Sequence, residues 1–326
     1  MEKELKWAVL GTGVIANEMA QALQKMGKKL YAVANRTYDK AVEFAEKYGA
    51  EKVYEKIDDM FTDKESDIIY ITTPHNTHIK FMLEALKNGK HVLCEKSITL
   101  NSEELEEAVK IAKEKNLILG EAMTIFNMPL YTKLSDIVNS GKLGDVKMIQ
   151  VNFGSYKEYD MNNRFFNRNL AGGALLDIGV YAISITRLFM TSKPDNVLSQ
   201  VKYAPTGVDE QVGIIMMNKE QQMSTIALTL HSKQPKRVVI ACEKAYIEVL
   251  EYPRADKAKI VYTETGEIEE IEEGITANAL QYEMQNMEKS VKSGINQMKL
   301  EYTRDVMDIM TNLRKEWGMT YPEEEK

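Results

Sequence analysis

The segment "HVLCEKSITL" places two opposite charges, Glu95 and Lys96, at the end of a run that is typical of a buried strand. Such a strand usually stops at Gly, Asn or Asp instead. In open α/β sheets, ligands bind at the carboxyl ends of parallel strands. At that edge a carboxylate can bind hydroxyl groups of a ligand, and an ammonium can polarise or protonate a substrate oxygen. A purely structural ion pair explains the spacing equally well, so the surrounding elements must decide between the two interpretations.

The stretch "VLGTGVIA" is the second feature that could belong to a functional site, because Gly11 and Gly13 separate an apolar run from an amphipathic one. Gly11 permits a tight turn, Gly13 lets the backbone approach a pyrophosphate, and the helix N-terminus that follows attracts the anion. Ala16, at the third small position, allows close helix packing. A glycine-rich turn without a ligand is the alternative. Because the stretch follows a strand pattern and precedes a helix pattern, we interpret it as a dinucleotide-binding turn that includes Val14 and Ile15.

The end of the next expected strand, "VANRTYDK", indicates which dinucleotide is bound. An Asp or Glu about twenty residues beyond the glycines would bind the ribose 2′-hydroxyl of NAD. Asn35 and Arg36 stand there instead, and Asp39 falls later, inside the next expected helix. A guanidinium can hold a 2′-phosphate through two hydrogen bonds, and Lys40 could add charge. The sequence therefore favours NADP over NAD, with a solvated surface role for Arg36 as the alternative.

The first 121 residues alternate between short apolar runs and longer amphipathic stretches. The runs are too short for helices, and one helix is expected to open at Ser102 with its following acids. Strand, helix, strand at this spacing predicts an α/β protein whose N-terminal domain is a Rossmann-type, doubly wound parallel sheet. The expected strands span residues 7–11, 30–35, 67–72, 91–95 and 117–122.

After about residue 122 the pattern changes to an α+β one. The acidic stretch 264–274 is expected to be a solvated hairpin or edge strand. We predict a large, mostly antiparallel sheet and two domains, 1–122 for dinucleotide binding and 123–326 for substrate binding and oligomerisation. The expected helices lie at 131–141 and 172–190 and at the C-terminus, and the expected strands at 147–156, 196–203, 211–217, 223–231, 236–241, 245–250 and 259–263.

Composition excludes several other classes of protein. The net charge of -7 disfavours partners such as nucleic acid or an anionic membrane. No run is expected to reach the length of a membrane span, and the N-terminus lacks a signal-peptide pattern. Cys94 and Cys242 have no disulfide or metal spacing, so we expect both to be buried, reduced core residues. These features predict a cytoplasmic protein.

Five motifs, "GTGVIA", "TTPHNTH", "CEKSITL", "EAM" and "GGALLDIGVYAI", together resemble the glucose–fructose oxidoreductase / inositol dehydrogenase (Gfo/Idh/MocA) family, in order and across both domains. The resemblance implies that Glu95 is a cofactor-site carboxylate and that Lys96 is the catalytic lysine. Ser97 replaces the family's proline, which leaves the backbone geometry after the lysine open, including any cis peptide. The resemblance also places a further segment along the nicotinamide side of the cofactor, with Thr73, Pro74, Asn76 and His78.

Asp177 and Tyr181 lie four residues apart in an expected helix and so share one face. Gly172 and Gly173 precede them and allow the start of the helix to approach another segment or a ligand. An isolated pair of this kind is more often a hydrogen bond on a helix face. Many members of the family carry histidine at the position of Tyr181. With its tyrosine, this sequence resembles the branch that contains glucose–fructose oxidoreductases, dihydrodiol dehydrogenases and NADP-dependent xylose dehydrogenases.

The expected reaction moves a hydride between nicotinamide and a CH–OH or C=O carbon of a sugar, polyol or related diol. Lys96 and Tyr181 handle the hydroxyl proton, and Asp177 orients them. A phenol with a pKa of about 10 is a poor base, so an adjacent ammonium would help. No metal is expected, because His75 and His78 lack a third ligand.

Two alternatives stay open: a non-catalytic NAD(P)-binding regulator on the same fold, and an NAD-linked inositol-type dehydrogenase, which Tyr181 and Arg36 disfavour. Substrate specificity would come from the loop 156–173, whose Arg164, Phe165, Phe166 and Arg168 are candidates to line the pocket. An open antiparallel sheet leaves an apolar face uncovered unless another subunit packs on it. We therefore expect a homodimer or homotetramer, as the resemblance also implies.

Overall fold

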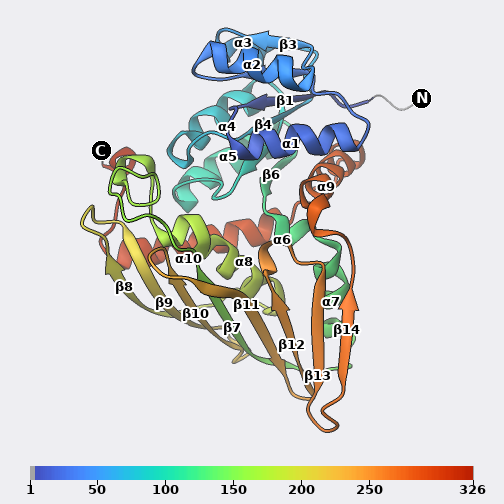
Figure 1. Cartoon of the computed structure of the whole chain (residues 1–326), viewed down its shortest axis with the longest axis vertical. Helices are drawn as coiled ribbons and strands as arrows, with labels where there is room; N and C mark the ends of the chain where they lie inside the picture. The colour runs from blue at the N-terminus through green and yellow to red at the C-terminus, as the bar shows by residue number, and fades with distance from the viewer. Residues whose placement is uncertain (1–3, 326) are drawn as a thin grey trace. The chain divides into compact units, whose positions relative to one another are not determined.

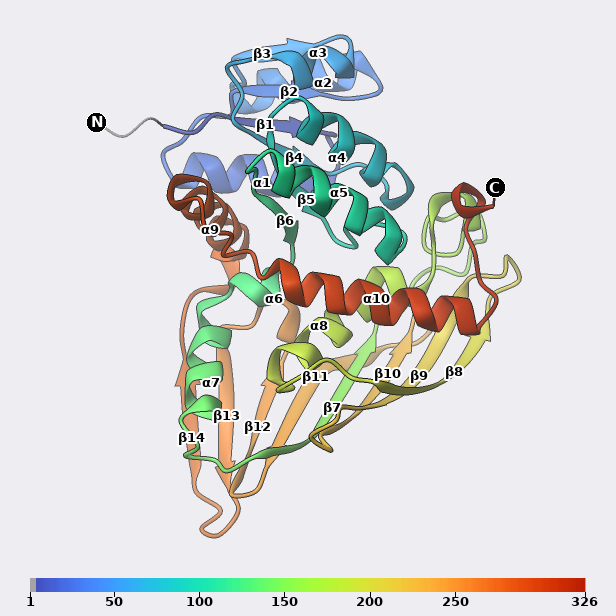
Figure 2. The same ribbon diagram turned by 180° about the vertical axis from the view of Figure 1, so that it is seen from behind.

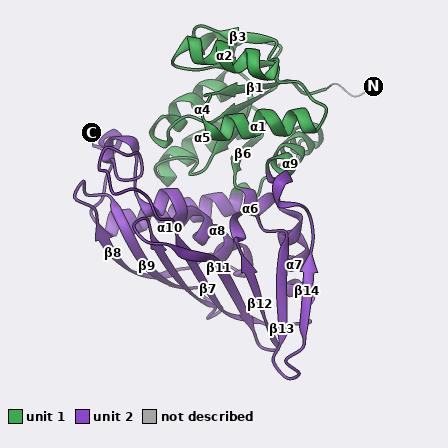
Figure 3. Ribbon diagram, in the orientation of Figure 1, with its two compact units in different colours: residues 1–123, 280–300 green, residues 124–279, 301–326 purple. Residues whose placement is uncertain are grey.

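The computed structural model describes residues 4–325 and divides into two compact units (Figure 3). The first unit contains the chain up to Met123 together with Leu280–Leu300. The second contains Thr124–Ala279 and the residues from Glu301 onward. The hydrophobic pattern placed a boundary near residue 122, but it gave no sign that the chain later returns to the first unit.

The first unit is built on a six-stranded sheet in the order β3-β2-β1-β4-β5-β6 (Figure 1). All of its strand pairs are parallel, which confirms the predicted doubly wound sheet. Every residue of β1, β2 and β4 is buried, as expected for strands covered on both faces. The strands are β1 Trp7–Leu10, β2 Ala32–Ala34, β3 Lys52–Tyr54, β4 Ile68–Ile71, β5 His91–Glu95 and β6 Leu119–Ala122.

Two details of this unit differ from the prediction. Strand β3 was not expected, because only its last residue, Tyr54, is buried. Helix α5 begins at Ser102 as predicted, but the capping side chain is that of Asn101, which accepts the Glu104 N–H at 2.9 Å. The helices are α1 Val14–Lys25, α2 Tyr38–Tyr48, α3 Ile57–Thr62, η1 His75–Thr77, α4 His78–Lys87, α5 Ser102–Glu114 and α9 Ala279–Ser293.

Helix α9 joins the first unit through contacts that no local pattern reveals. Trp7 Nε1 donates to Glu288 Oε1 at 2.9 Å, and Lys28 forms an ion pair with the same carboxylate. Beyond the helix, the side chain of Met298 packs on Gly120 of β6, where an added Cβ would lie 2.7 Å from its Cγ. These contacts explain why the returning segment belongs to this unit.

The second unit contains an eight-stranded sheet in the order β14-β13-β12-β11-β7-β10-β9-β8 (Figure 2). Only the β7–β10 pair is parallel, which confirms the predicted mostly antiparallel sheet. The acidic stretch contains the turn and the second strand of the β13–β14 hairpin, and β14 is the sheet edge. The strands are β7 Val146–Gly154, β8 Asn196–Tyr203, β9 Asp209–Met217, β10 Met223–Thr229, β11 Gln234–Cys242, β12 Ala245–Leu250, β13 Lys257–Tyr262 and β14 Ile268–Glu272.

The helix expected at 172–190 begins later and irregularly, with a π-helical turn at Leu175–Gly179 that continues into α8, Val180–Phe189. Helix α8 packs against β7 and β10, and Arg187 Nε donates to Asp305 Oδ2 of α10 at 2.7 Å. The other α-helices of this unit are α6 Thr124–Asn127, α7 Pro129–Asn139 and α10 Leu300–Glu316.

The expectation that no run reaches membrane length was wrong for one segment. The segment Arg168–Phe189 is long enough to cross a membrane, and a stretch of 18 residues within it has a mean hydropathy of 1.3. However, 78% of that stretch is buried inside the structure. It is therefore best explained as a core helix.

The two cysteines are free, and only one of them is fully buried. Burial raises the pKa of the Cys94 thiol well above its usual value. Cys242 is partly exposed, contrary to expectation, yet its partial burial raises the pKa of its thiol to about 11. Neither thiol is therefore poised to react as a thiolate at neutral pH.

Candidate active site

The glycine turn follows β1 as the sequence predicts. Gly11 has a φ of +108°, and an added Cβ would lie 2.5 Å from Thr72 Oγ1, so only glycine fits there. Its N–H donates to the Ala34 carbonyl oxygen at 2.8 Å, which ties the turn to the end of β2.

The first turn of α1 is open. Gly13 is its N-cap residue, with φ −74° and no atom within 4 Å of an added Cβ. No side chain in the described part of the chain caps this helix, and its first turn holds no acid. The backbone N–H groups are thus free of the usual side-chain partners, while buried Ala16 lets the helix pack closely. This arrangement fits the pyrophosphate of a dinucleotide.

Arg36 follows the carboxyl end of β2, the strand that pairs with β1. Its side chain is exposed, and within residues 4–325 no ion pair engages it. Asn35 Nδ2 donates to the Thr37 carbonyl oxygen at 3.0 Å, which shapes this turn. Lys40 is exposed on the first turn of α2, next to Asp39. The residues predicted to select the cofactor therefore follow the end of β2 in a largely exposed segment.

Strand β5 ends at Glu95, as predicted, and the Tyr70 hydroxyl donates to its carboxylate. The bond between Lys96 and Ser97 is cis. His75 Nε2 lies 3.0 Å from the Lys96 carbonyl oxygen, and His78 Nδ1 lies 3.0 Å from that of Ser97. The segments that follow β4 and β5 are therefore tied together.

His78 is completely buried, and burial lowers the pKa of its imidazole. Its second nitrogen, Nε2, lies 2.7 Å from the Thr73 carbonyl oxygen. Both ring nitrogens thus face protein carbonyls, and direct contact of His78 with a cofactor stays a prediction. Pro74 is exposed and Asn76 partly so, which leaves this side of the segment accessible. In the described chain, no group of three or more His, Cys, Asp or Glu residues is arranged to hold a metal.

In the second unit, Asp177 and Tyr181 are the only residues of 171–186 that are not buried. The other residues of this stretch are buried, so the two side chains share one accessible face, as predicted. The ring of Phe153 from β7 packs beside Tyr181, with centroids 6.1 Å apart, and also contacts Tyr252. This packing restricts the directions that the Tyr181 ring can take.

The loop 156–173 brings only part of the predicted set to this face. Arg164 Nη2 lies 3.9 Å from Asp177 Oδ1, and its guanidinium stacks on Phe165 at 4.3 Å from the ring centroid. Arg168 instead donates from Nε to the Thr320 carbonyl oxygen at 2.8 Å. Phe166 is fully buried and cannot line a pocket.

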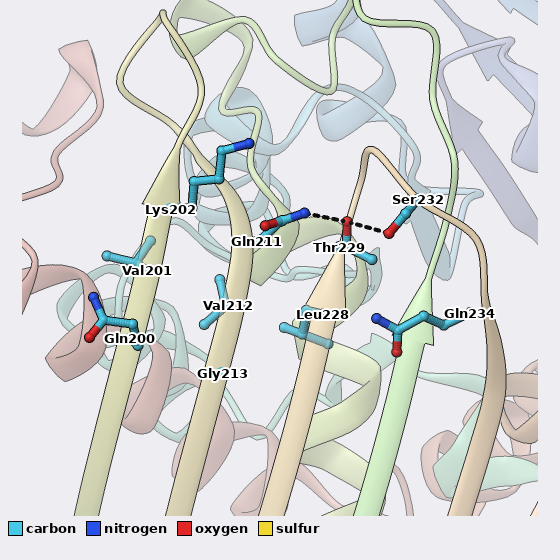
Figure 4. Close-up of a pocket in the computed structure, with 10 residues that line it drawn as sticks. All are labelled: Gln200, Val201, Lys202, Gln211, Val212, Gly213, Leu228, Thr229, Ser232 and Gln234. Carbon is cyan, nitrogen blue, oxygen red and sulfur yellow. Dashed lines mark hydrogen bonds between the residues drawn. The ribbon is translucent and has the colours of Figure 1, made fainter.

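The second unit also has a hollow of about 560 Å³ among strands β8 to β11 (Figure 4). Gln211 Nε2 and Ser232 Oγ both reach Thr229 Oγ1, at 3.5 and 3.2 Å. None of the predicted site residues contributes to it, so it is separate from the face of Asp177 and Tyr181. It is lined by Gln200, Val201, Lys202, Gln211, Val212, Gly213, Leu228, Thr229, Ser232 and Gln234.

Three residues beside the predicted site escaped the sequence analysis: Phe153, Tyr252 and Asp209. The aromatic pair has no motif, and each residue lies in an ordinary strand or turn pattern. Asp209 was detectable only as one of two adjacent acids before an apolar run, "VDEQVG". Such acids are usually solvated, but both are completely buried here.

Comparisons with known proteins agree with this arrangement. The model of the oxidoreductase family with an NAD-binding Rossmann fold matches residues 5–123, and the Gfo/Idh/MocA C-terminal domain matches residues 131–248. The chain belongs to the Gfo/Idh/MocA family. As a Gfo/Idh/MocA protein it is an oxidoreductase with an NAD(P)-binding Rossmann domain, which confirms the class predicted from the sequence.

Curated relatives span the whole chain. Trans-1,2-dihydrobenzene-1,2-diol dehydrogenase of Xenopus laevis is 28% identical over 329 residues, covering 97% of this chain and 99% of the relative. The enzyme of the same name from Homo sapiens is 26% identical, covering 99% of both chains. These relatives are named as enzymes, which disfavours the regulator.

Two solved structures share the fold of this chain at low sequence identity. KijD10, a 3-ketoreductase from Actinomadura kijaniata in complex with NADP and TDP-benzene, has a TM-score of 0.86 at 19% identity, over 96% of this chain and 98% of that one. Levoglucosan dehydrogenase, in complex with NADH and levoglucosan, has a TM-score of 0.83 at 17% identity, over 95% and 98%.

The open space over Gly13 generates a prediction about cofactor binding. Gly13→Ala fits the backbone and the space, so the melting temperature should stay unchanged. The new methyl group would stand where the pyrophosphate must approach, so the Kd of NADPH should rise at least about tenfold. Calorimetry measures both. The control is Gly213→Ala, another glycine with open space around its added Cβ, in the second unit. Wild-type NADPH affinity in Gly13→Ala would reject the assignment.

Proposed function

We propose that this chain is an NADP-preferring oxidoreductase that interconverts a CH–OH and a C=O carbon of a sugar, polyol or related diol. The observation that carries the proposal is the pair Asp177 and Tyr181, which alone are not buried in an otherwise buried stretch. The names of the similar proteins, a diol dehydrogenase, a 3-ketoreductase and a levoglucosan dehydrogenase, support this substrate class.

The proposed chemistry assigns one task to each group. The nicotinamide, when bound, supplies or accepts the hydride. Lys96 and Tyr181 carry the proton of the substrate hydroxyl, because a phenol and an ammonium can both donate to a carbonyl oxygen that gains negative charge. Asp177 accepts hydrogen bonds and orients its neighbours. Arg164, at 3.9 Å from Asp177, restrains this carboxylate and adds a donor for substrate hydroxyls.

Preference for NADP is tested at Arg36. Arg36→Ala should weaken NADPH at least about tenfold and NADH little, because charge-assisted contacts contribute roughly 1.5–3 kcal/mol. Arg36→Lys should recover only part of the affinity, since an ammonium lacks the planar fork of the guanidinium. Fluorescence titration gives each Kd. Lys25→Ala, which removes an exposed charge at the other end of α1, is the control. Equal weakening of NADPH and NADH would contradict the role of Arg36.

The proton-transfer pair is tested by Lys96→Ala and Tyr181→Phe. Each should bind NADPH almost normally and lose about 10²- to 10⁴-fold in kcat, the usual contribution of a positioned acid–base group. In the double variant the two losses should not multiply, because both groups serve one proton transfer. Steady-state kinetics on a panel of aldoses, polyols and dicarbonyls gives kcat, and thermal melts are run on the same preparations.

Tyr246→Phe is the matched control for the hydroxyl deletion, because Tyr246 lies partly exposed on β12. A structural ion pair at Lys96 would give a different result. Lys96→Ala would then melt at a lower temperature while its folded fraction kept full activity, and this outcome would end the catalytic assignment.

We also propose that the protein forms a homodimer or homotetramer through its eight-stranded sheet. Leu198 of β8 and Ile215 of β9 lie directly opposite each other and are 63% and 46% exposed. Sedimentation at micromolar concentration should show an assembly, and Leu198→Glu combined with Ile215→Glu should dissociate it. Ile295→Glu, at an exposed apolar residue of the first unit, should not. A 37.2 kDa species alone in the wild type would refute the proposal.

A further inference from the structure

A carboxylate from strand β9 forms a hydrogen bond with the start of the helix that carries Asp177 and Tyr181. Asp209, the first residue of β9, is completely buried, and its Oδ2 accepts the Leu175 N–H at 2.6 Å. Ala174, the N-cap residue of the π-helical turn, offers no side-chain hydrogen bond of its own. Asp209, although distant in the sequence, therefore provides the hydrogen-bond acceptor that an N-cap side chain usually provides to the first turn of a helix.

The glycine pair before this turn fits tightly against the same carboxylate. Gly173 has a φ of +127°, and an added Cβ would overlap Asp209 Oδ1. The Gly173 N–H donates to the Phe165 carbonyl oxygen at 3.0 Å. The pair is thus enclosed between the loop that carries Arg164 and the carboxylate of Asp209.

The C-terminal segment also contacts the glycine pair. The Tyr321 hydroxyl donates to the Gly172 carbonyl oxygen at 2.7 Å, and the Arg314 guanidinium lies 4.7 Å from the centroid of the Tyr321 ring. Arg314 also makes two hydrogen bonds to Glu324, at 2.7 and 2.8 Å. In the described chain, Asp209 Oδ1 has no hydrogen-bond partner.

We propose that Asp209 is a positioning residue of the active site, which fixes the first turn of the helix and thereby the directions of Asp177 and Tyr181. This role rests on the proposed function, in which these two side chains act on the substrate. Leu175 lies two residues before Asp177. A shift of this turn would therefore displace the reactive groups directly.

The energetics argue that the carboxylate is there for position and not for stability. Burial is the main cause that raises the pKa of Asp209 to about 7, while the Leu175 N–H and the Arg314 guanidinium act in the opposite direction. The folded pKa lies above the ordinary value of 3.8. Stability from the bound proton is thus present at low pH and is lost as the pH rises through about 7. Near and above neutral pH, this carboxylate lowers the stability of the fold.

The test compares Asp209→Ala with Asp209→Asn, which keeps an oxygen that can accept the Leu175 N–H. We expect kcat to fall roughly ten- to a hundredfold in the alanine variant, as for small misplacements of catalytic groups. The asparagine variant should stay within about threefold of the wild type, and NADPH affinity should change in neither. A merely structural role predicts lower melting temperatures with wild-type kcat in the folded fraction, and this result would overturn the proposal.

The matched control is Asp305→Ala, which removes the ion pair at the other end of α8 and should leave kcat unchanged. If Asp209→Ala does not fold, Asp209→Ser is tested in its place. The serine side chain is too short to accept the Leu175 N–H, so the same fall in kcat is expected. Hydrogen exchange of amides 174–182 supplies a readout that needs no substrate. Faster exchange in the alanine or serine variant, but not in the asparagine variant, is expected, and identical exchange would overturn the proposal. Absence of wild-type turnover on every substrate would count against the proposed function alone.

Discussion

The position of Lys96 depends on two contacts between imidazole rings and backbone carbonyls. His75 reaches the Lys96 carbonyl oxygen and His78 reaches that of Ser97, each at 3.0 Å. Both rings come from the segment after β4, so two neighbouring strand ends are tied together at the edge where ligands bind. A lysine side chain has many rotamers, and a fixed backbone narrows the region that its ammonium can reach. The backbone that carries Lys96 at the end of β5 is thus fixed before any ligand binds.

In the second unit, packing provides the restraint. The helix that bears Asp177 and Tyr181 is buried on every side but one, and its first turn is π-helical. Such turns are rare and occur often at functional sites. Rotation of this helix would expose apolar side chains to water and bury the two polar ones, both of which are unfavourable. The two side chains therefore keep one direction without needing a rigid loop.

Local features of the sequence predicted the parts that local physics determines: the end of β5 at Glu95, the glycine turn, and the shared face of Asp177 and Tyr181. Strand β3 was missed because one buried residue in three gives no apolar run. His78 and Arg168 show another limit. The family resemblance placed the first beside the cofactor, and its position in the expected specificity loop placed the second beside the substrate. In the structure each of them also contacts a protein atom far away in the sequence, 19 and 152 positions off, which only the folded chain brings close.

Each unit has a buried carboxylate that accepts a backbone N–H close to a residue predicted to be catalytic. Glu121 of β6 is 1% exposed and accepts the Ile98 N–H at 3.2 Å, two residues after Lys96. Asp209 does the same two residues before Asp177. A charged acceptor makes a stronger and more directional bond than a neutral one, but its burial lowers stability unless it is well bonded. An apolar residue would suit either position better if stability alone mattered. The carboxylates lie instead where the neighbouring side chain reaches solvent, which is where a fixed backbone direction has a use.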